Sequence, residues 1–259
     1  MQAATLIDML QRDAQAAPLL AALTTDPSAE GDWLDWDALA RPAVMAPLLA
    51  RYARVSGHPD GDLRALASLW SRWHFWVSVP PLVASVLLHR SLPDILALRL
   101  DAGQQNCGLR LAPAVRRCTA VDDGSVDDGP VDAAALHEAL TASAAPLVAT
   151  LAGLSGASPR VFWNNFGNYV EYVHRQLDGH PRRVAAAATA LDELLTRPVL
   201  AGGGVNLLYR PVRYLHDAVP PAPDGTRVRR ICCLAYLLPD TALCSNCPRL
   251  YPPERGSRV

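Results

Sequence analysis

The spacing of apolar side chains predicts that most of the chain is helical. Over residues 5–23 apolar side chains recur at helical spacing, until Pro18 breaks or kinks the run. Pro42 stands where a further helix can begin, because proline is well tolerated in the first turn of a helix. Residues 62–76 carry leucines and tryptophans on one stripe, which predicts a stronger helix.

The pattern changes after a pair of prolines. Pro80-Pro81 punctuates the strong helix, and a second apolar helix is expected to run from there to about residue 89. Residues 96–101 and 108–112 then alternate between apolar and polar side chains, which is typical of strands. The stretch AGQQNC between them supplies a turn, so the two segments predict a β-hairpin.

The second half of the chain again predicts helices. Residues 131–154 read as helix, and Ser158-Pro159 opens the next one with an N-cap and a first-turn proline. Residues 181–196 form a further helix. Two late segments, 206–215 and 227–237, are expected to be extended.

Composition narrows the class of protein. Half of the 259 residues are hydrophobic, which argues against a disordered chain, and a formal net charge of −1 gives no field that would attract nucleic acid. The N-terminus lacks the basic region of a signal peptide, and no apolar stretch reaches the ~18 residues of a spanning helix. We therefore expect a cytoplasmic protein. Because thiols stay reduced there, closely spaced cysteines indicate metal ligands rather than disulfides.

Four of the six cysteines lie close together near the C-terminus. Cys232 and Cys233 are adjacent, ten residues follow, and Cys244 and Cys247 then form a Cys-x-x-Cys pair. A Cys-x-x-Cys turn can direct both sulfurs at one metal, and the Pro-Asp within the intervening segment allows it to fold back. Four thiolates on one short loop suit either tetrahedral Zn²⁺ or an iron–sulfur centre.

The adjacent pair helps to separate these two options. Neighbouring side chains of an extended strand point to opposite faces, so one zinc ion could bind both Cys232 and Cys233 only after a local twist. Structural zinc sites typically space their paired ligands by two to four residues, whereas a two-iron cluster is wider and accepts sulfurs that diverge. The spacing therefore favours iron–sulfur over zinc. Cys107 and Cys118 lack ligand-like spacing and are expected to be buried or incidental thiols.

The cysteine segment resembles that of the FhuF-like ferric siderophore reductases. In that family a C-terminal Cys-Cys-x10-Cys-x2-Cys motif holds a [2Fe–2S] cluster. The flanking residues agree as well: Arg229-Arg230, Leu234, Tyr236, Leu238-Pro239 and Pro248. The stretch Trp163-Asn164-Asn165 is similar to a Trp-x-Asn element of the family. The resemblance is strong over the cysteine segment and weaker over the rest of the chain.

This resemblance implies a cytoplasmic enzyme that reduces Fe³⁺ in an imported siderophore to Fe²⁺ by one electron, through a [2Fe–2S] cluster, and so releases the iron. The metal ligands would be Cys232, Cys233, Cys244 and Cys247, with no catalytic residue identified beyond the cluster. The substrate-binding candidates are Trp163, Asn164, Asn165, Arg229 and Arg230, for which the alternatives are core packing for the tryptophan and ordinary solvation for the arginines.

The resemblance and the motifs also suggest partners. A ferric siderophore, with the hydroxamate type favoured, is the expected substrate. Since the sequence has no Rossmann or flavin fingerprint, a ferredoxin or flavoprotein reductase is the expected electron donor. Peripheral association with the inner membrane or with an importer is a further expectation, and no nucleic acid is expected to bind.

Together these observations predict an α+β fold that is predominantly helical, with a small antiparallel sheet and a C-terminal iron–sulfur loop. Residues 1–205 would form a body that resembles a domain of siderophore synthetases, with the hairpin near 96–112. Residues 206–259 would form the extended, cluster-binding region. Two other functions stay open: a zinc-stabilised Cys₄ binding or scaffold protein in siderophore handling, and an electron-transfer or iron-sensing module.

Overall fold

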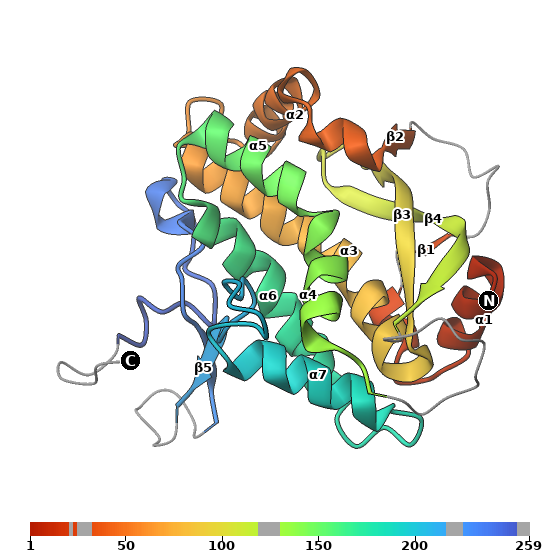
Figure 1. Ribbon diagram of the computed structural model, residues 1–259. Coiled ribbons are helices and arrows are strands. Elements are labelled where there is room, and N and C mark those ends of the chain that lie inside the picture. Colours follow the sequence, from red (N-terminus) through yellow and green to blue (C-terminus); the bar gives the residue numbers. More distant parts are fainter. Residues whose placement is uncertain (21–22, 25–32, 119–129, 216–224, 253–259) are drawn as a thin grey trace.

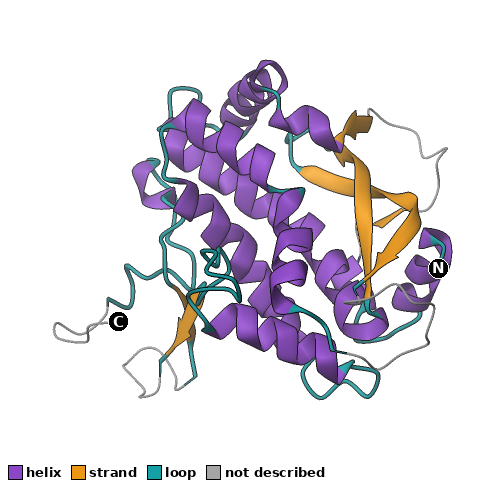
Figure 2. Ribbon diagram, in the orientation of Figure 1, coloured by secondary structure: helices purple, strands orange, loops and turns teal. Residues whose placement is uncertain are grey.

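The computed structural model shows a helical body with a small sheet at one side and the C-terminal segment at the other (Figure 1). It describes residues 1–20, 23–24, 33–118, 130–215 and 225–252. The helices in this part are α1 (Ala3–Gln11), α2 (Pro42–Val55), α3 (Leu63–His89), α4 (Ala133–Ala142), α5 (Ala145–Ser155), α6 (Pro159–Gln176) and α7 (Ala185–Thr196). Figure 2 shows how helices dominate, so the predicted fold class is confirmed.

A four-stranded sheet packs beside α1 and α3. Its strands are β1 (Leu23–Thr24), β2 (Trp33–Asp35), β3 (Ser91–Leu100) and β4 (Asn106–Arg117), in the order β1-β4-β3-β2. The pairs β2–β3 and β3–β4 are antiparallel, and the short β1 runs parallel to β4. Leu98 lies opposite Leu109 in the β3–β4 register. The predicted hairpin is therefore confirmed, although both strands extend beyond the expected bounds.

The long central helix α3 runs through Pro80 and Pro81 without a break, so the predicted interruption was wrong. Neither proline has an N–H, and the carbonyls of Trp76 and Val77 therefore lose their usual helical donors. Every side chain from Val77 to Leu88 is buried. Packing on all sides thus outweighs a local cost of about 3 kcal/mol for each proline.

The predicted helix over 131–154 is instead two helices, α4 and α5, which meet at an angle of 53°. Pro146 in the first turn of α5 has no N–H with which to continue the α4 ladder. By length and composition this bent pair would suffice to cross a membrane, whereas no single helix of the described chain would. The next predicted start is confirmed, because the Ser158 hydroxyl accepts a hydrogen bond from the backbone N–H of Arg160 at 3.3 Å.

The apolar core connects the body with the start of the cysteine segment. One continuous cluster of buried side chains extends from α1 to α7 and includes Leu238. Gly61, just before α3, lies so close to this leucine that a Cβ there would be 2.8 Å from Leu238 Cδ2. The close approach docks the chain beyond the first cysteine pair on the body. The predicted boundary at residue 205 stays a prediction, and residues 216–224 and 253–259 of the predicted C-terminal region lie outside the described residues.

Candidate metal centre

A short hairpin leads the chain into the cysteines. Strands β5 (Val212–Tyr214) and β6 (Arg227–Arg229) pair antiparallel, and β6 ends three residues before Cys232. The backbone N–H of Arg229 donates to the carbonyl of Asn246 at 2.9 Å, which places the Cys-x-x-Cys turn beside the end of β6. That turn is closed by a 2.9 Å hydrogen bond from the N–H of Cys247 to the carbonyl of Cys244.

These backbone contacts bring the two predicted cysteine pairs together. The sulfurs of Cys233 and Cys244 lie 3.9 Å apart. Leu234 takes a left-handed conformation with φ of 64°, and a single 3₁₀ turn, η3 (Ala235–Leu237), follows it. The chain therefore reverses immediately after the adjacent pair instead of continuing as the extended segment predicted over 227–237. Cys233 and Cys247 are buried, whereas Cys232 and Cys244 are half-buried.

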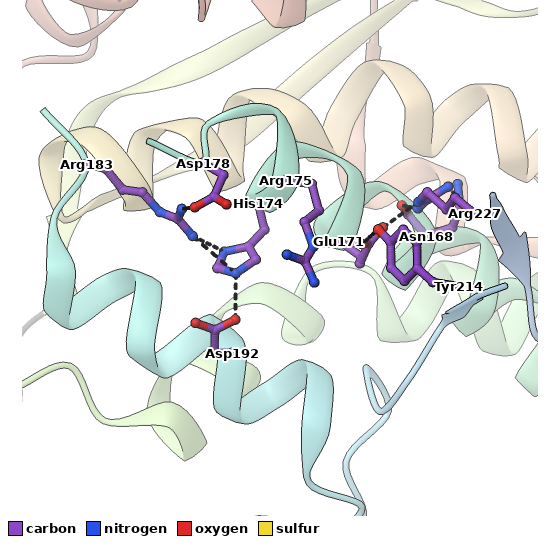
Figure 3. Close-up of polar contacts among 9 residues, drawn as sticks. All are labelled: Asn168, Glu171, His174, Arg175, Asp178, Arg183, Asp192, Tyr214 and Arg227. Carbon is purple, nitrogen blue, oxygen red and sulfur yellow. Dashed lines mark hydrogen bonds and ion pairs between the residues drawn. The ribbon is translucent and has the colours of Figure 1, made fainter. Parts of the chain in front are cut away.

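A single carboxylate on α6 anchors the hairpin (Figure 3). Glu171 accepts hydrogen bonds from the hydroxyl of Tyr214 on β5 and from Nε of Arg227 on β6, the latter at 2.5 Å. Tyr214 and Arg227 are register partners, so one buried side chain fixes both strands. Arg227 also donates to the side-chain oxygen of Asn168 at 3.0 Å. The hairpin therefore has a fixed position on α6.

The following turn of α6 is bonded to the neighbouring helix α7 through a histidine. His174 lies 2.8 Å from a carboxylate oxygen of Asp192 on α7, and Arg183 contacts the same imidazole (Figure 3). Burial lowers the pKa of His174, although Asp192 acts in the opposite direction. Helix α6 is thus held on one side by α7 and holds the hairpin on the other.

Asn164 joins the entry and the exit of the hairpin. Its Nδ2 donates to the carbonyl of Pro211, just before β5, at 2.7 Å. Its Oδ1 accepts from the N–H of Ile231, next to the first cysteine, at 3.3 Å. One buried amide on α6 therefore positions the chain on both sides of β5–β6.

Two arginines approach the cysteines from the body. The Arg229 guanidinium is fully buried and donates to Oδ1 of Asn165, whose Nδ2 donates to the hydroxyl of Ser71 at 2.8 Å. Arg72 on α3 donates to the sulfur of Cys233 over 3.7 Å. Burial lowers the pKa of Arg229; it opposes charge on Arg72 too, but nearby Cys233 and Tyr169 raise the pKa of Arg72 overall. Positive charge is thus held beside the thiols.

The thiols differ in acidity because they contact one another. Hydrogen bonds from Cys232 and Cys244 lower the pKa of Cys233, and Arg229 favours its thiolate further. The same hydrogen bonds raise the pKa of Cys232 and Cys244. Ionising all the thiols together is unfavourable without a cation, and thiolate ligands release their protons when a metal binds.

The donor set fits an iron–sulfur cluster better than a single ion. Four cysteines supply the thiolates that a [2Fe–2S] cluster requires. A tetrahedral zinc centre would need all four to converge on one point, whereas a two-iron cluster accepts two separate pairs of sulfurs, such as Cys232 with Cys233 and Cys244 with Cys247. A cluster with four thiolates is negatively charged, and Arg72 and Arg229 offset that charge.

The five candidate substrate residues divide into two groups. Trp163, Asn164 and Arg230 line a cavity of about 700 Å³ that also reaches the cysteine segment. Asn165 and Arg229 are instead buried and bonded to each other. Cys107 lies in β4 and Cys118 just beyond it, outside the C-terminal cysteine segment, and burial raises the pKa of Cys118 to about 11.

Sequence reasoning missed Arg72 and Glu171, and each leaves a recognisable signal. Beyond its first turn, α3 carries Arg72 as its one arginine, lysine, aspartate or glutamate. Glu171 is the single acidic residue of α6. A charged residue with aromatic or apolar neighbours in the sequence, such as Trp70 and Trp73 around Arg72 or Val170 and Tyr172 beside Glu171, indicates a buried partner, because an unpaired buried charge is costly.

Comparisons with known proteins agree with this geometry. The model of a family described as "Ferric iron reductase FhuF-like transporter" matches residues 68–219, which span α3 to α7 and β5. A second model, "FhuF 2Fe-2S C-terminal domain", matches residues 229–249 with the four cysteines. The chain is 25% identical over 213 residues to the ferric siderophore reductase of Escherichia coli (strain K12), covering 80% of this chain and 75% of that protein.

Proposed function

The chain belongs to the FhuF-like ferric iron reductase family, and from this premise we propose that it reduces siderophore-bound Fe³⁺ to Fe²⁺. Its C-terminal segment matches the 2Fe-2S domain of that family, so its cofactor is a [2Fe–2S] cluster. The observation that carries the proposal is the position of the four cysteines, which lie beside the cationic Arg72 and next in sequence to two residues, Ile231 and Pro248, that line a cavity of about 700 Å³.

Cys232, Cys233, Cys244 and Cys247 are the proposed ligands. When bound, the cluster supplies one electron at a time. Siderophore oxygens such as hydroxamates are hard donors that hold Fe³⁺ more strongly than Fe²⁺. One electron gained by the chelated iron therefore weakens the complex and releases the metal, with no bond formed between siderophore and protein.

The other residues of the site bind the substrate, orient the charged groups and exclude water. Arg72 and Arg229 place positive charge beside the thiolates, and Asn165 orients the Arg229 guanidinium. Burial of Cys233 and Cys247 limits the access of water to that side. Trp163 and Arg230 offer an aromatic wall and a cation to a substrate in the cavity, while Asn164 fixes the shape of its wall.

The compartment, the electron donor and the type of siderophore are further parts of the proposed function. We place the protein in the cytoplasm, where the electron donor would be a ferredoxin or a flavoprotein reductase, with peripheral contact to the inner membrane or an importer. A compartment that keeps thiols reduced suits four closely spaced cysteine ligands. A ferric hydroxamate is the proposed substrate.

The test is anaerobic purification followed by a single-turnover reaction. We expect a red-brown protein with iron and sulfide in equal amounts. After chemical reduction and removal of the reductant, a ferric tris-hydroxamate should restore the oxidised spectrum, and a ferrous-specific chelator should trap one Fe²⁺ for each electron lost. A colourless protein with stoichiometric zinc would overturn the proposal in favour of a scaffold. A reduced cluster that no ferric siderophore reoxidises would favour an electron-transfer or iron-sensing module.

A further inference from the structure

The cavity beside the cysteines is strongly cationic. Four arginines line it, namely Arg160 at the start of α6, Arg210 and Arg213 around the start of β5, and Arg230 after β6. Ile231 and Pro248 complete the wall next to Cys232 and Cys247. We call this space the arginine cavity. A molecule bound in it would lie against the two residues that flank the cysteine motif.

No acidic side chain of the described residues lines the arginine cavity. None of its four arginines takes part in an ion pair within the described part of the chain, whereas elsewhere Arg182, Arg183 and Arg227 pair with carboxylates. Arg210 and Arg230 lie over the ring of Tyr209, at 5.4 and 5.9 Å from its centroid. Arg213 donates to the carbonyl of Tyr251. Like charges held close together favour the binding of an anion.

The shape of the cavity favours a small molecule over a protein surface. Its volume of about 700 Å³ lies within the range of roughly 300–1,000 Å³ that is typical of small-molecule sites. Trp163 and Tyr209 provide aromatic walls between the charges. Guanidinium groups bind carboxylates through paired hydrogen bonds, so a small ligand with free carboxylates would match both the volume and the charge of the cavity.

We propose that the arginine cavity binds the ferric chelate through negatively charged oxygens that the chelate does not use to hold iron. This inference rests on the proposed reductase function and adds the charge of its substrate. The protein then prefers an anionic chelate to a neutral one with the same iron ligands. The arginines contact charged groups at the periphery of the complex and leave its iron coordination unchanged.

Binding of redox-inert gallium chelates tests the inference apart from reduction. Two gallium tris-hydroxamates would share one scaffold, one bearing free carboxylates and the other the corresponding neutral amides. Titration into the cluster-loaded protein should show tighter binding of the carboxylate form, by about tenfold or more for each well-formed charge-assisted contact. Arg160→Gln and Arg213→Gln should each weaken that form about tenfold and leave the neutral form unaffected.

Matched variants keep the result interpretable. Arg213→Lys keeps the charge and should retain much of the preference, and Arg54→Gln removes an exposed arginine of α2 that is not in the cavity and should change nothing. Equal affinity for the two chelates, or no effect of the cavity variants, would overturn the inference even if ferric chelates still reoxidise the cluster. Slower reduction by an acidic ferredoxin, with unchanged chelate binding, would instead identify the cavity as a donor-docking site.

Discussion

Two basic side chains in the middle of helix α3, Arg72 and His74, have opposite surroundings. Two residues apart on a helix, they project to roughly opposite sides. His74 is fully buried between Trp36 and Trp70, with ring centroids 4.9 and 5.0 Å away, and burial lowers its pKa to about 3. Burial opposes the charge on Arg72 as well, but nearby Cys233 and Tyr169 raise its pKa above the ordinary value.

The difference shows that α3 separates two environments. On the body side a titratable group is kept neutral, and no described residue offers a hydrogen bond to either ring nitrogen of His74. On the cysteine side the same helix presents a permanent cation to a thiol. The face of α3 around His74 thus excludes charge, whereas the face toward the cysteines holds a cation.

The largest effect should come from Cys244→Ser. The variant is expected to lose the cluster, because serine replaces one of four thiolate ligands. The body should remain folded, since its apolar core includes none of these cysteines. Visible absorption and iron content report the first effect, and far-ultraviolet circular dichroism the second. Cys107→Ser is the control and should keep both signals; a normal spectrum for Cys244→Ser would show that the ligand set is wrong.

The body side should respond to acid through His74. Its pKa in the folded protein lies below the ordinary 6.5, so the unfolded chain takes up the proton first. The contribution of neutral His74 is complete above pH 6.5 and is lost as the pH falls toward about 3. By pH 5 the free energy of unfolding should drop by about 2 kcal/mol from this group. Urea titrations at several pH values measure the free energy of unfolding, and the His74→Phe variant should lack this acid-dependent decrease. An equal decrease in the parent protein and the variant would contradict the prediction.

The cysteine side should respond to the loss of charge at Arg72. Arg72→Gln removes a cation that stabilises the more negative, reduced cluster, so the reduction potential should fall. A Coulomb interaction of roughly 1–2 kcal/mol corresponds to roughly 40–90 mV for one electron. Potentiometric titration followed by optical spectra measures the shift. Arg72→Lys should stay close to the parent, and a rise in potential for Arg72→Gln would show that the arginine does not act through its charge.

The sequence predicted those features that depend on local chemistry. The Ser158-Pro159 helix start, the β3–β4 hairpin and the spacing of the cysteine motif are all set by neighbouring residues. The failures depend on tertiary packing. Burial keeps α3 intact through Pro80, and no local pattern reveals that.

The site shows the same division between local and long-range information. The cysteines are visible as a motif, but their surroundings come from distant segments. Asn165 meets Arg229 across 64 positions, and Arg72 meets Cys233 across 161. A polar residue on a helix or strand predicts a solvated face unless its partner is known, so the buried positions of Asn165 and Arg229 could be found only from the fold.

The anchoring of the hairpin has a consequence for how the protein matures. The contacts of Asn164 and Glu171 with the hairpin involve no cysteine. The chain before the first cysteine pair can therefore take its place on α6 before any iron arrives. A newly made polypeptide would then present its thiols to the cellular assembly machinery on a body that is already folded. Insertion of the cluster would have to order only the short loop around the cysteines, so its entropic cost would be small.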